Sequence, residues 1–287
     1  EAVKDAKNVK HFYSWASFGA NELQKIGHNH VKHLRGSISD KEYYKLEGEK
    51  ILDIRARFKL SDSFIIGFVF RNQLRKTVSS LLDALKEINE ERPDNNIKVL
   101  LHTNWKEGWD IKSLMAERGI ADNQVLTTYV CNKCKDYSIS PFVGHDINCP
   151  SCRTEKSVNT VSIAAGVFDY HLNEIYNVMN MYVHPFTSGG QEIPIQEAML
   201  TETPCACTNY SCGVDFCNEE SGGIPLSWSE FVEFPTRFKK ASTHPASIVD
   251  AINTVMKWSP QKYSEVGKKS RQYILNEPQL YPTSQFG

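Results

Sequence analysis

Residues 181–208 constrain the fold of this chain more than any other stretch. They are typical of a short buried strand at Met181–Pro185, a glycine-bearing turn, a helix, and a second strand at Cys205–Thr208. Pro194 suits the first turn of the helix, where a missing N–H costs nothing, and Pro204 favours a return to extended backbone. The stretch predicts a strand–helix–strand unit whose turn aims free N–H groups at an anion. On geometry alone, an ordinary crossover with a tight glycine turn is an equally good interpretation.

The same alternation of strand and helix extends over most of the chain from Ser63 onward. The apolar run Phe64–Phe70 is typical of a buried parallel strand, and Val78–Asn89 has apolar residues at helical spacing. We therefore predict an α/β protein with a doubly wound, Rossmann-like parallel sheet, whose ligands bind beyond the carboxyl ends of the strands. The further predicted strands are Ile97–His102, Val125–Val130 and Val161–Phe168, and the further helices are Ile111–Arg118, Leu172–Met179, Pro245–Trp258 and Pro260–Leu275.

The net charge and the apolar runs of the chain limit the kinds of partner that it is expected to bind. A formal net charge of -1 over 287 residues supplies no basic field for nucleic acid, so none is expected as a partner. No apolar run approaches the ~20 residues of a transmembrane helix, although peripheral membrane contact stays open. Without a signal peptide, and with cysteines in metal-type spacing, the expected location is the cytoplasm.

Four cysteines carry the sharpest local pattern in the chain, Cys131-x2-Cys134-x14-Cys149-x2-Cys152. Two such pairs predict a closed tetrahedral zinc site, with two redox Cys-x-x-Cys motifs as the alternative. Four thiolates leave no open coordination position, so the zinc is expected to be structural. We expect a zinc ribbon at residues 131–152, inserted in the α/β domain. The remaining thiols fit no common metal spacing and are expected to be buried: Cys205, Cys207, Cys212 and Cys217.

The 181–208 stretch resembles the signature of retaining GT-B glycosyltransferases, in which Glu-Gly-Phe-Gly-Leu-Pro-x-x-Glu-Ala-Met follows a strand. Glu197-Ala198-Met199 matches the final Glu-Ala-Met, and Pro194 matches the proline. The family's first glutamate falls on Gly189, and its second glycine falls on Glu192. One of the two acidic positions is therefore empty, and Glu192 is a candidate substitute.

The loop after the first strand of the alternation is similar to the family's Gly-Arg-Leu-x-x-x-x-Lys-Gly. Arg71 and Lys76 keep the five-residue offset, while Phe70 and Thr77 replace the flanking glycines. Two cations at a strand's carboxyl end suit a diphosphate on chemical grounds, and a pair of solvated charges is the alternative.

The resemblance implies specific roles for these residues. Arg71 and Lys76 would contact the donor phosphates, and Glu197 would accept hydrogen bonds from the ribose hydroxyls. The remaining implied donor-binding residues are the turn residues Gly189, Gly190, Gln191, Glu192 and Ile193, together with Phe168 and Leu172 near the nucleotide base.

The resemblance also divides the chain. Ser14–Gly36 is similar to the run that closes the first, acceptor-binding domain of these enzymes. Residues 1–60 would then be the end of that domain and a linker, with a strand at Val9–Ser14 and a charged helix at Lys41–Lys59. Residues 61–275 would form the nucleotide-sugar-binding domain, followed by a tail at 276–287. Most of the acceptor domain would be absent from this sequence.

The implied activity is transfer of a sugar from a nucleotide-sugar donor to an acceptor hydroxyl, with retained anomeric configuration and without a catalytic metal. The acceptor (a glycan, a lipid or a protein) is not specified by the sequence. Two alternatives stay open: a GT-B nucleotide-sugar epimerase that uses the same pocket, and a catalytically inactive module that binds a nucleotide sugar or a protein partner.

Overall fold

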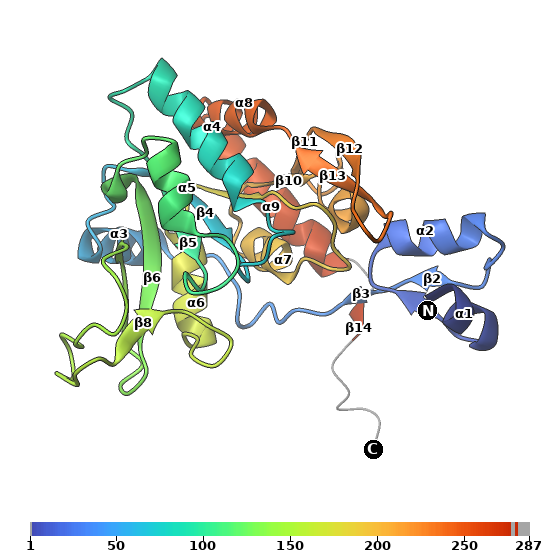
Figure 1. Cartoon of the computed structure of the whole chain (residues 1–287), viewed down its shortest axis with the longest axis horizontal. Coiled ribbons are helices and arrows are strands. Elements are labelled where there is room, and N and C mark those ends of the chain that lie inside the picture. The colour runs from blue at the N-terminus through green and yellow to red at the C-terminus, as the bar shows by residue number, and fades with distance from the viewer. Residues whose placement is uncertain (1, 277–278, 281–287) are drawn as a thin grey trace.

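The computed structural model describes residues 2–276 and 279–280. It is built around one sheet with the strand order β11-β10-β9-β4-β5-β6-β7 (Figure 1). The strands from β11 to β6 are parallel, whereas β7 and β8 both pair antiparallel with β6. The strand bounds are β4 Phe64–Val69, β5 Ile97–His102, β6 Val125–Cys131, β7 Tyr137–Pro141, β8 Val158–Thr160, β9 Met181–His184, β10 Cys205–Thr208 and β11 Ile224–Leu226.

The order of the parallel strands creates a topological switch point. The first of them along the chain, β4, lies between β5 and β9, so successive strands extend the sheet in opposite directions from this position. This is the 3-2-1-4-5-6 order of doubly wound nucleotide-binding sheets, in which ligands bind outside the carboxyl ends at the switch point. The predicted doubly wound parallel sheet is confirmed.

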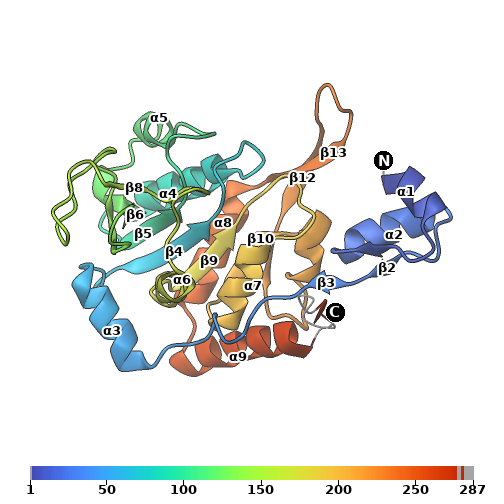
Figure 2. The same ribbon diagram turned by 90° about the horizontal axis from the view of Figure 1, so that it is seen from below.

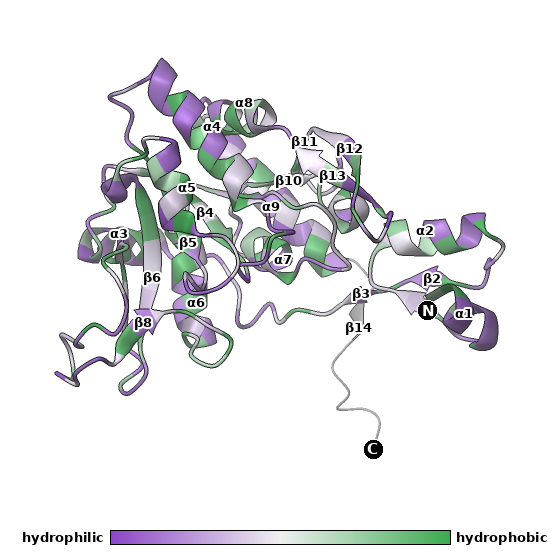
Figure 3. Cartoon of the chain, viewed as in Figure 1, coloured by the Kyte–Doolittle hydropathy of each residue, from purple (hydrophilic) through white to green (hydrophobic). Residues whose placement is uncertain are grey.

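Helices cover both faces of the sheet, as the turned view shows (Figure 2). Neighbouring strand residues such as Ile65 and Ile66 belong to different hydrophobic cores, because successive side chains point to opposite faces. Hydrophobic residues gather where helices meet the sheet, whereas α1 at the molecule's edge is largely hydrophilic (Figure 3). One face carries α4 Val78–Glu91, α5 Ile111–Glu117 and α8 Pro245–Met256, and the other carries α3 Gly48–Arg57, α6 Asp169–Asn177, α7 Ile193–Leu200 and α9 Pro260–Asn276.

Residues 2–36 form a small unit beside the sheet (Figure 1). It contacts the main body through the Ser17 amide, which donates to Asp215 at 2.9 Å, and through the rings of Phe18 and Tyr210. The division of the chain into domains stays a prediction. The elements of this region are α1 Ala2–Asn8, β1 Tyr13–Ser14, α2 Ser17–Lys25, β2 Lys32–His33 and β3 Arg35–Gly36, the last paired with β14 Gln279–Leu280.

Three sequence expectations about local structure were wrong. Only Tyr13–Ser14 of the expected strand at Val9–Ser14 is extended, after a helix at Ala2–Asn8. The expected helix at Lys41–Lys59 begins only at Gly48, because side chains of α6 hold the preceding backbone: Asn173 accepts from the Tyr44 amide and Asn177 from the Leu46 amide. Residues 161–168 form no strand, because Ser162 and Ala165 close a turn through two backbone hydrogen bonds.

Three strands between β10 and α8 were not expected. The Gly222–Pro225 region contains the edge strand β11, whose place at the edge of the sheet tolerates a proline. A hairpin formed by β12 Trp228–Val232 and β13 Lys239–Thr243 follows it. Of the expected tail at 276–287, all but Asn276 and Gln279–Leu280 lies outside the described residues. Among the described residues, no helix has both the length and the apolarity needed to span a bilayer.

Candidate functional site

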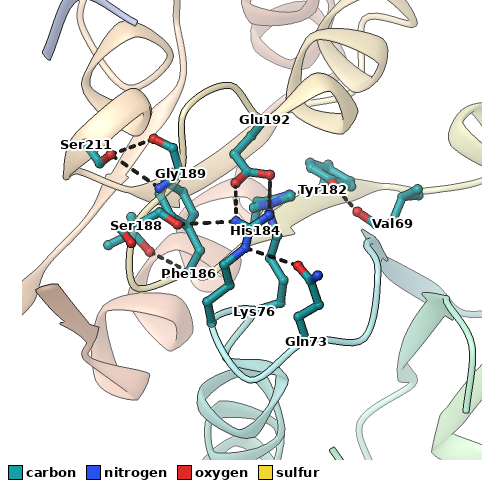
Figure 4. Close-up of polar contacts among 12 residues, drawn as sticks. Val69, Gln73, Lys76, Tyr182, His184, Phe186, Ser188, Gly189, Glu192 and Ser211 are labelled. Atoms are coloured by element: carbon teal, nitrogen blue, oxygen red, sulfur yellow. Dashed lines mark hydrogen bonds and ion pairs between the residues drawn. The ribbon is translucent and has the colours of Figure 1, made fainter. Parts of the chain in front are cut away.

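A charged cluster lies at the switch point, beyond the carboxyl ends of β4 and β9 (Figure 4). Lys76 comes from the β4–α4 loop, His184 ends β9, and Glu192 directly precedes α7. Lys76 Nζ forms an ion pair with the Glu192 carboxylate and lies 2.9 Å from Nε2 of His184. All three side chains are buried, so their charges interact more strongly than they would in water.

The hydrogen bonds around His184 define its protonation. The Tyr182 hydroxyl donates to the Val69 carbonyl at 3.0 Å and therefore accepts from Nδ1 of His184 at 2.7 Å. Nε2 is then the acceptor, and it receives a hydrogen bond from the Lys76 ammonium group. Burial, together with the adjacent Lys76 charge, lowers the pKa of His184 to about 4. The ring is thus neutral near pH 7 and orients the Lys76 side chain.

Glu192 is held as a carboxylate between two cations. Arg75 Nη1 lies 3.0 Å from its Oε1 and also donates to the Ser188 carbonyl at 3.3 Å. Burial opposes ionisation of Glu192, but the charge and the hydrogen bond of Lys76 outweigh burial and hold the pKa of its carboxyl group well below the usual value. Two cations face one carboxylate, which leaves one positive charge for an anionic ligand.

The glycine turn places Glu192 over Gly189. A Cβ atom built on Gly189 would overlap the Glu192 carboxylate and lie 3.1 Å from Sγ of Cys212. The turn is fixed by Ser211, whose hydroxyl donates to the Gly189 carbonyl at 2.6 Å and accepts from its amide at 3.3 Å. Gln191 donates to the carbonyl of Gly36 at 3.1 Å. Gly190 and Ile193 are exposed at the start of α7, where the first amides of the helix have no intrahelical acceptor.

A pocket of about 250 Å³ opens beside this cluster at the ends of β4 and β5. Burial lowers the pKa of His102 to about 4, and its Nδ1 has no hydrogen-bond partner within the described part of the chain. The same holds for the buried Thr103 hydroxyl. Both residues line the pocket, although these two atoms are themselves buried. Its lining residues are Val69, Phe70, Arg71, His102, Thr103, Asn104, Glu107, Val161, Ser162, Ile163, Gly166 and Pro194.

The structure does not bring the three expected catalytic residues into one contact. Arg71 lines the pocket and pairs with Glu107 at 3.5 Å, whereas Lys76 lies in the charged cluster. Glu197 is buried on α7, where its carboxylate accepts from the Tyr176 hydroxyl at 2.6 Å, and the Tyr43 hydroxyl is a second hydrogen-bonding neighbour.

The two residues expected near the base lie elsewhere than on the pocket wall. Phe168 is exposed and stacks on Tyr170 with ring centroids 5.4 Å apart. Leu172 packs against the hydrophobic core on the α7 side of the sheet. The loop just before them, at Ser162 and Gly166, supplies the pocket lining instead.

Stability is expected to depend on pH through Glu197. Burial raises the pKa of its carboxyl group to about 7, against about 4.3 in an unfolded chain. The native state therefore binds more protons than the unfolded state between these values, so the contribution of Glu197 to stability is largest below about pH 4 and is lost as pH rises to 7. The shift corresponds to about 4 kcal/mol.

Glu197→Gln should remove this dependence while keeping a hydrogen-bond acceptor for Tyr176. We expect the difference in unfolding free energy between this variant and the wild type, measured by urea titration, to favour the variant by about 3 kcal/mol more at pH 8 than at pH 4. Glu220→Gln, at an exposed position, is the control. Parallel curves for wild type and Glu197→Gln would contradict the prediction.

The four cysteines of the predicted zinc site converge. The Sγ atoms of Cys131, Cys134, Cys149 and Cys152 all lie within 4.8 Å of one another. Cys131 and Cys152 are 3.7 Å apart, as are Cys134 and Cys149. Tetrahedral zinc with Zn–S bonds of about 2.3 Å places sulfurs roughly 3.8 Å apart, so the cluster fits the ion. As expected, Cys205, Cys207, Cys212 and Cys217 are buried free thiols.

Arg75 and His184 were not among the expected site residues. His184 had a usable signal, since it is a polar residue at the carboxyl end of an otherwise apolar strand, next to a glycine turn. Arg75 had a weaker one, because it lies beside Lys76 but outside the family's spacing. Its contact with Glu192 spans 117 residues of sequence.

Comparisons with known proteins place the fold. No protein-family model matches the sequence, and no curated protein is significantly similar to it. Solved structures match closely in shape. Anabaena HepE, in complex with UDP and glucose, has a TM-score of 0.67 at 14% identity over 97% of this chain and 62% of its own. Sucrose-phosphate synthase from Thermosynechococcus elongatus has a TM-score of 0.66 at 16% identity, over 97% of this chain and 56% of its own.

A glycosyltransferase from Rickettsia africae matches with a TM-score of 0.65 at 12% identity, over 96% of this chain and 63% of its own. This chain thus spans about six tenths of the length of these structures. At such low sequence identity, the structural likeness shows the fold alone. The chain has the Rossmann-like α/β fold of GT-B glycosyltransferases.

Proposed function

We propose that the chain binds a nucleotide sugar at the switch point and transfers the sugar to an acceptor hydroxyl with retained configuration. The observation that carries this proposal is the charged cluster. Lys76 and Arg75 converge with the amides of a glycine turn at the edge of the sheet where doubly wound proteins bind nucleotides. The fold neighbours support the ligand class, since HepE is recorded in complexes with UDP and with UDP-glucose.

Sugar transfer requires stabilisation of the leaving diphosphate. Negative charge grows on this group as the sugar departs, and two cations and the first amides of α7 would counter it without a catalytic metal. Removal of one such donor typically costs about 3 kcal/mol in other enzymes. The neutral His184 holds Lys76 Nζ toward this region. Arg71 would join from the pocket wall after leaving Glu107.

The pocket beside the cluster suits the nucleoside. His102 and Thr103 are polar residues of the pocket lining and would contact the base. Glu197 would hold the ribose by exchanging a tyrosine hydroxyl for a sugar hydroxyl. Glu197→Ala is then expected to weaken UDP binding. Isothermal titration calorimetry with UDP measures this effect.

We assign to Glu192 the role that the first glutamate of the signature has in the family. Its carboxylate occupies the space into which a side chain at position 189 would project. A glutamate at 189 and the native Glu192 therefore exclude each other sterically. In this chain the carboxylate belongs to a residue three positions later in the turn, and it occupies the same space.

A swap of the two positions tests this assignment. Glu192→Gly alone is expected to lower donor turnover at least about tenfold, and the double variant Gly189→Glu/Glu192→Gly should recover most of it. Turnover is measured as release of nucleoside diphosphate from UDP-glucose and other donors, with and without acceptor. Equal loss in the single and double variants, with binding of UDP intact, would remove Glu192 from this role.

A catalytically inactive nucleotide-sugar-binding module is the second candidate. The observation that favours it is the burial of Lys76, whose charge is already satisfied by Glu192. Donor-dependent release of nucleoside diphosphate would exclude this reading, whereas UDP binding without any release would favour it.

We also propose that the four-cysteine cluster holds a structural zinc ion. Four thiolates close the coordination shell, so the metal would stabilise the 131–160 region and take no part in sugar transfer.

A further inference from the structure

The β12–β13 hairpin carries an exposed aromatic tip. It projects from the body in the turned view (Figure 2). Phe234 is 89% exposed and Phe238 67% exposed, and Phe231 and Val232 beside them are also exposed. Exposing four neighbouring apolar side chains to water is unfavourable in free energy, and such exposed apolar patches mark contact sites.

The exposure belongs to an ordered element. The strands pair over five residue pairs. The turn is closed by the Glu233 amide, which donates to Phe238, and by the Arg237 amide, which donates to Glu233, both at 2.8 Å. At the base, the Ala241 amide donates to the Thr187 carbonyl at 3.0 Å. The fold therefore holds the aromatic side chains outward.

The hairpin carries three basic and two acidic side chains. Lys239 pairs with Glu230 at 3.1 Å, and Lys240 pairs with Glu233 at 2.5 Å. Arg237 forms no ion pair with any described residue, so the hairpin keeps one net positive charge beside its phenylalanines. Aromatic side chains flanked by cations match the boundary between headgroups and acyl chains of an anionic bilayer.

The size of the tip argues against a protein partner. A stable protein interface buries about 800 Å² on each side and involves roughly 20–30 residues per partner. Four side chains on a narrow convex projection supply much less. A lipid surface deforms around a small projection, so it gains binding free energy from a few inserted side chains.

We propose that the β12–β13 hairpin inserts Phe234 and Phe238 into an anionic membrane surface, with Arg237 at the headgroups. The proposal is independent of the reaction proposed above. It assigns the chain to the membrane surface as a peripheral protein.

Vesicle co-sedimentation of the full chain tests the proposal. We expect binding to vesicles of phosphatidylcholine and phosphatidylserine, and weaker binding to phosphatidylcholine alone. Phe234→Ser/Phe238→Ser should lower the partition coefficient on both by about tenfold or more, and Arg237→Gln should lower it only on the anionic vesicles.

A matched control uses Leu52→Ser. Leu52 is 65% exposed and belongs to α3, which lies far from the β12–β13 hairpin in Figure 2. This variant should bind like the wild type. Circular dichroism checks that every variant is folded. Absence of wild-type binding, or equal binding by the hairpin variant, would overturn the proposal. A wild-type dimer in sedimentation velocity that the hairpin variant loses would overturn it in favour of a second copy of the chain.

Discussion

Replacing Lys76 with methionine is expected to lower the free energy of unfolding by about 3–5 kcal/mol, because the substitution leaves the buried Glu192 carboxylate without its main partner. For a chain of this length, such a loss lowers the melting temperature by on the order of 10 °C. Differential scanning calorimetry and urea titration measure both quantities. Donor turnover should fall at least about tenfold in the same variant.

A double variant separates the ion pair from the rest of the site. In Lys76→Met/Glu192→Gln no charge is buried, and the new amide can donate to Nε2 of His184, so most of the lost stability should return. Lys86→Met is the control, since Lys86 pairs with Glu90 on the exposed face of α4 and should change stability by less than about 0.5 kcal/mol. A double variant as unstable as the single one would show that Lys76 stabilises the fold by another route.

Loss of the four-cysteine site should have a comparable or larger effect. Structural zinc sites contribute about 10–16 kcal/mol of apparent binding free energy in isolated zinc-finger peptides. Here Cys131 is the last residue of β6. β7 follows the first cysteine pair, β8 follows the second, and both strands pair with β6. Cys131→Ser/Cys149→Ser is therefore expected to unfold β7 and β8 and to expose one edge of the main sheet.

Metal analysis and hydrogen exchange check this expectation. The purified chain should carry about one zinc per molecule and the double variant none, and amides of residues 131–160 should lose protection in the variant while β9 and β10 keep theirs. Cys205→Ala, which removes a buried thiol outside the cluster, should leave zinc content unchanged. Full protection after complete removal of zinc by a chelator would contradict a stabilising role.

The sheet could be predicted from the sequence because its signals are local. Apolar runs such as Phe64–Val69 and prolines such as Pro204 mark strand and helix ends without reference to distant residues. The hairpin and β7 lack such signals. Their strands contain serine, threonine and charged residues, and they form because a partner strand is available.

Two residues of the charged cluster could be named from the sequence for the same reason. Lys76 and Glu192 were named from motif spacing, and the structure pairs them. The pairing itself, the neutral His184 between them, and the contact of Glu197 with Tyr176 and Tyr43 all depend on residues far apart in the chain. Spacing within one segment carries no information about such contacts.

The pairing of β3 with β14 connects the N-terminal unit to the segment that follows α9. Arg35–Gly36 and Gln279–Leu280 run side by side, so the exit from the N-terminal unit and the segment after α9 meet at a single two-stranded joint. A rotation of residues 2–36 against the sheet would therefore move β3 and β14 together and break the hydrogen bond between Ser17 and Asp215. Since Gly36 also accepts a hydrogen bond from Gln191, such a swing would pull directly on the glycine turn that holds Glu192 in place.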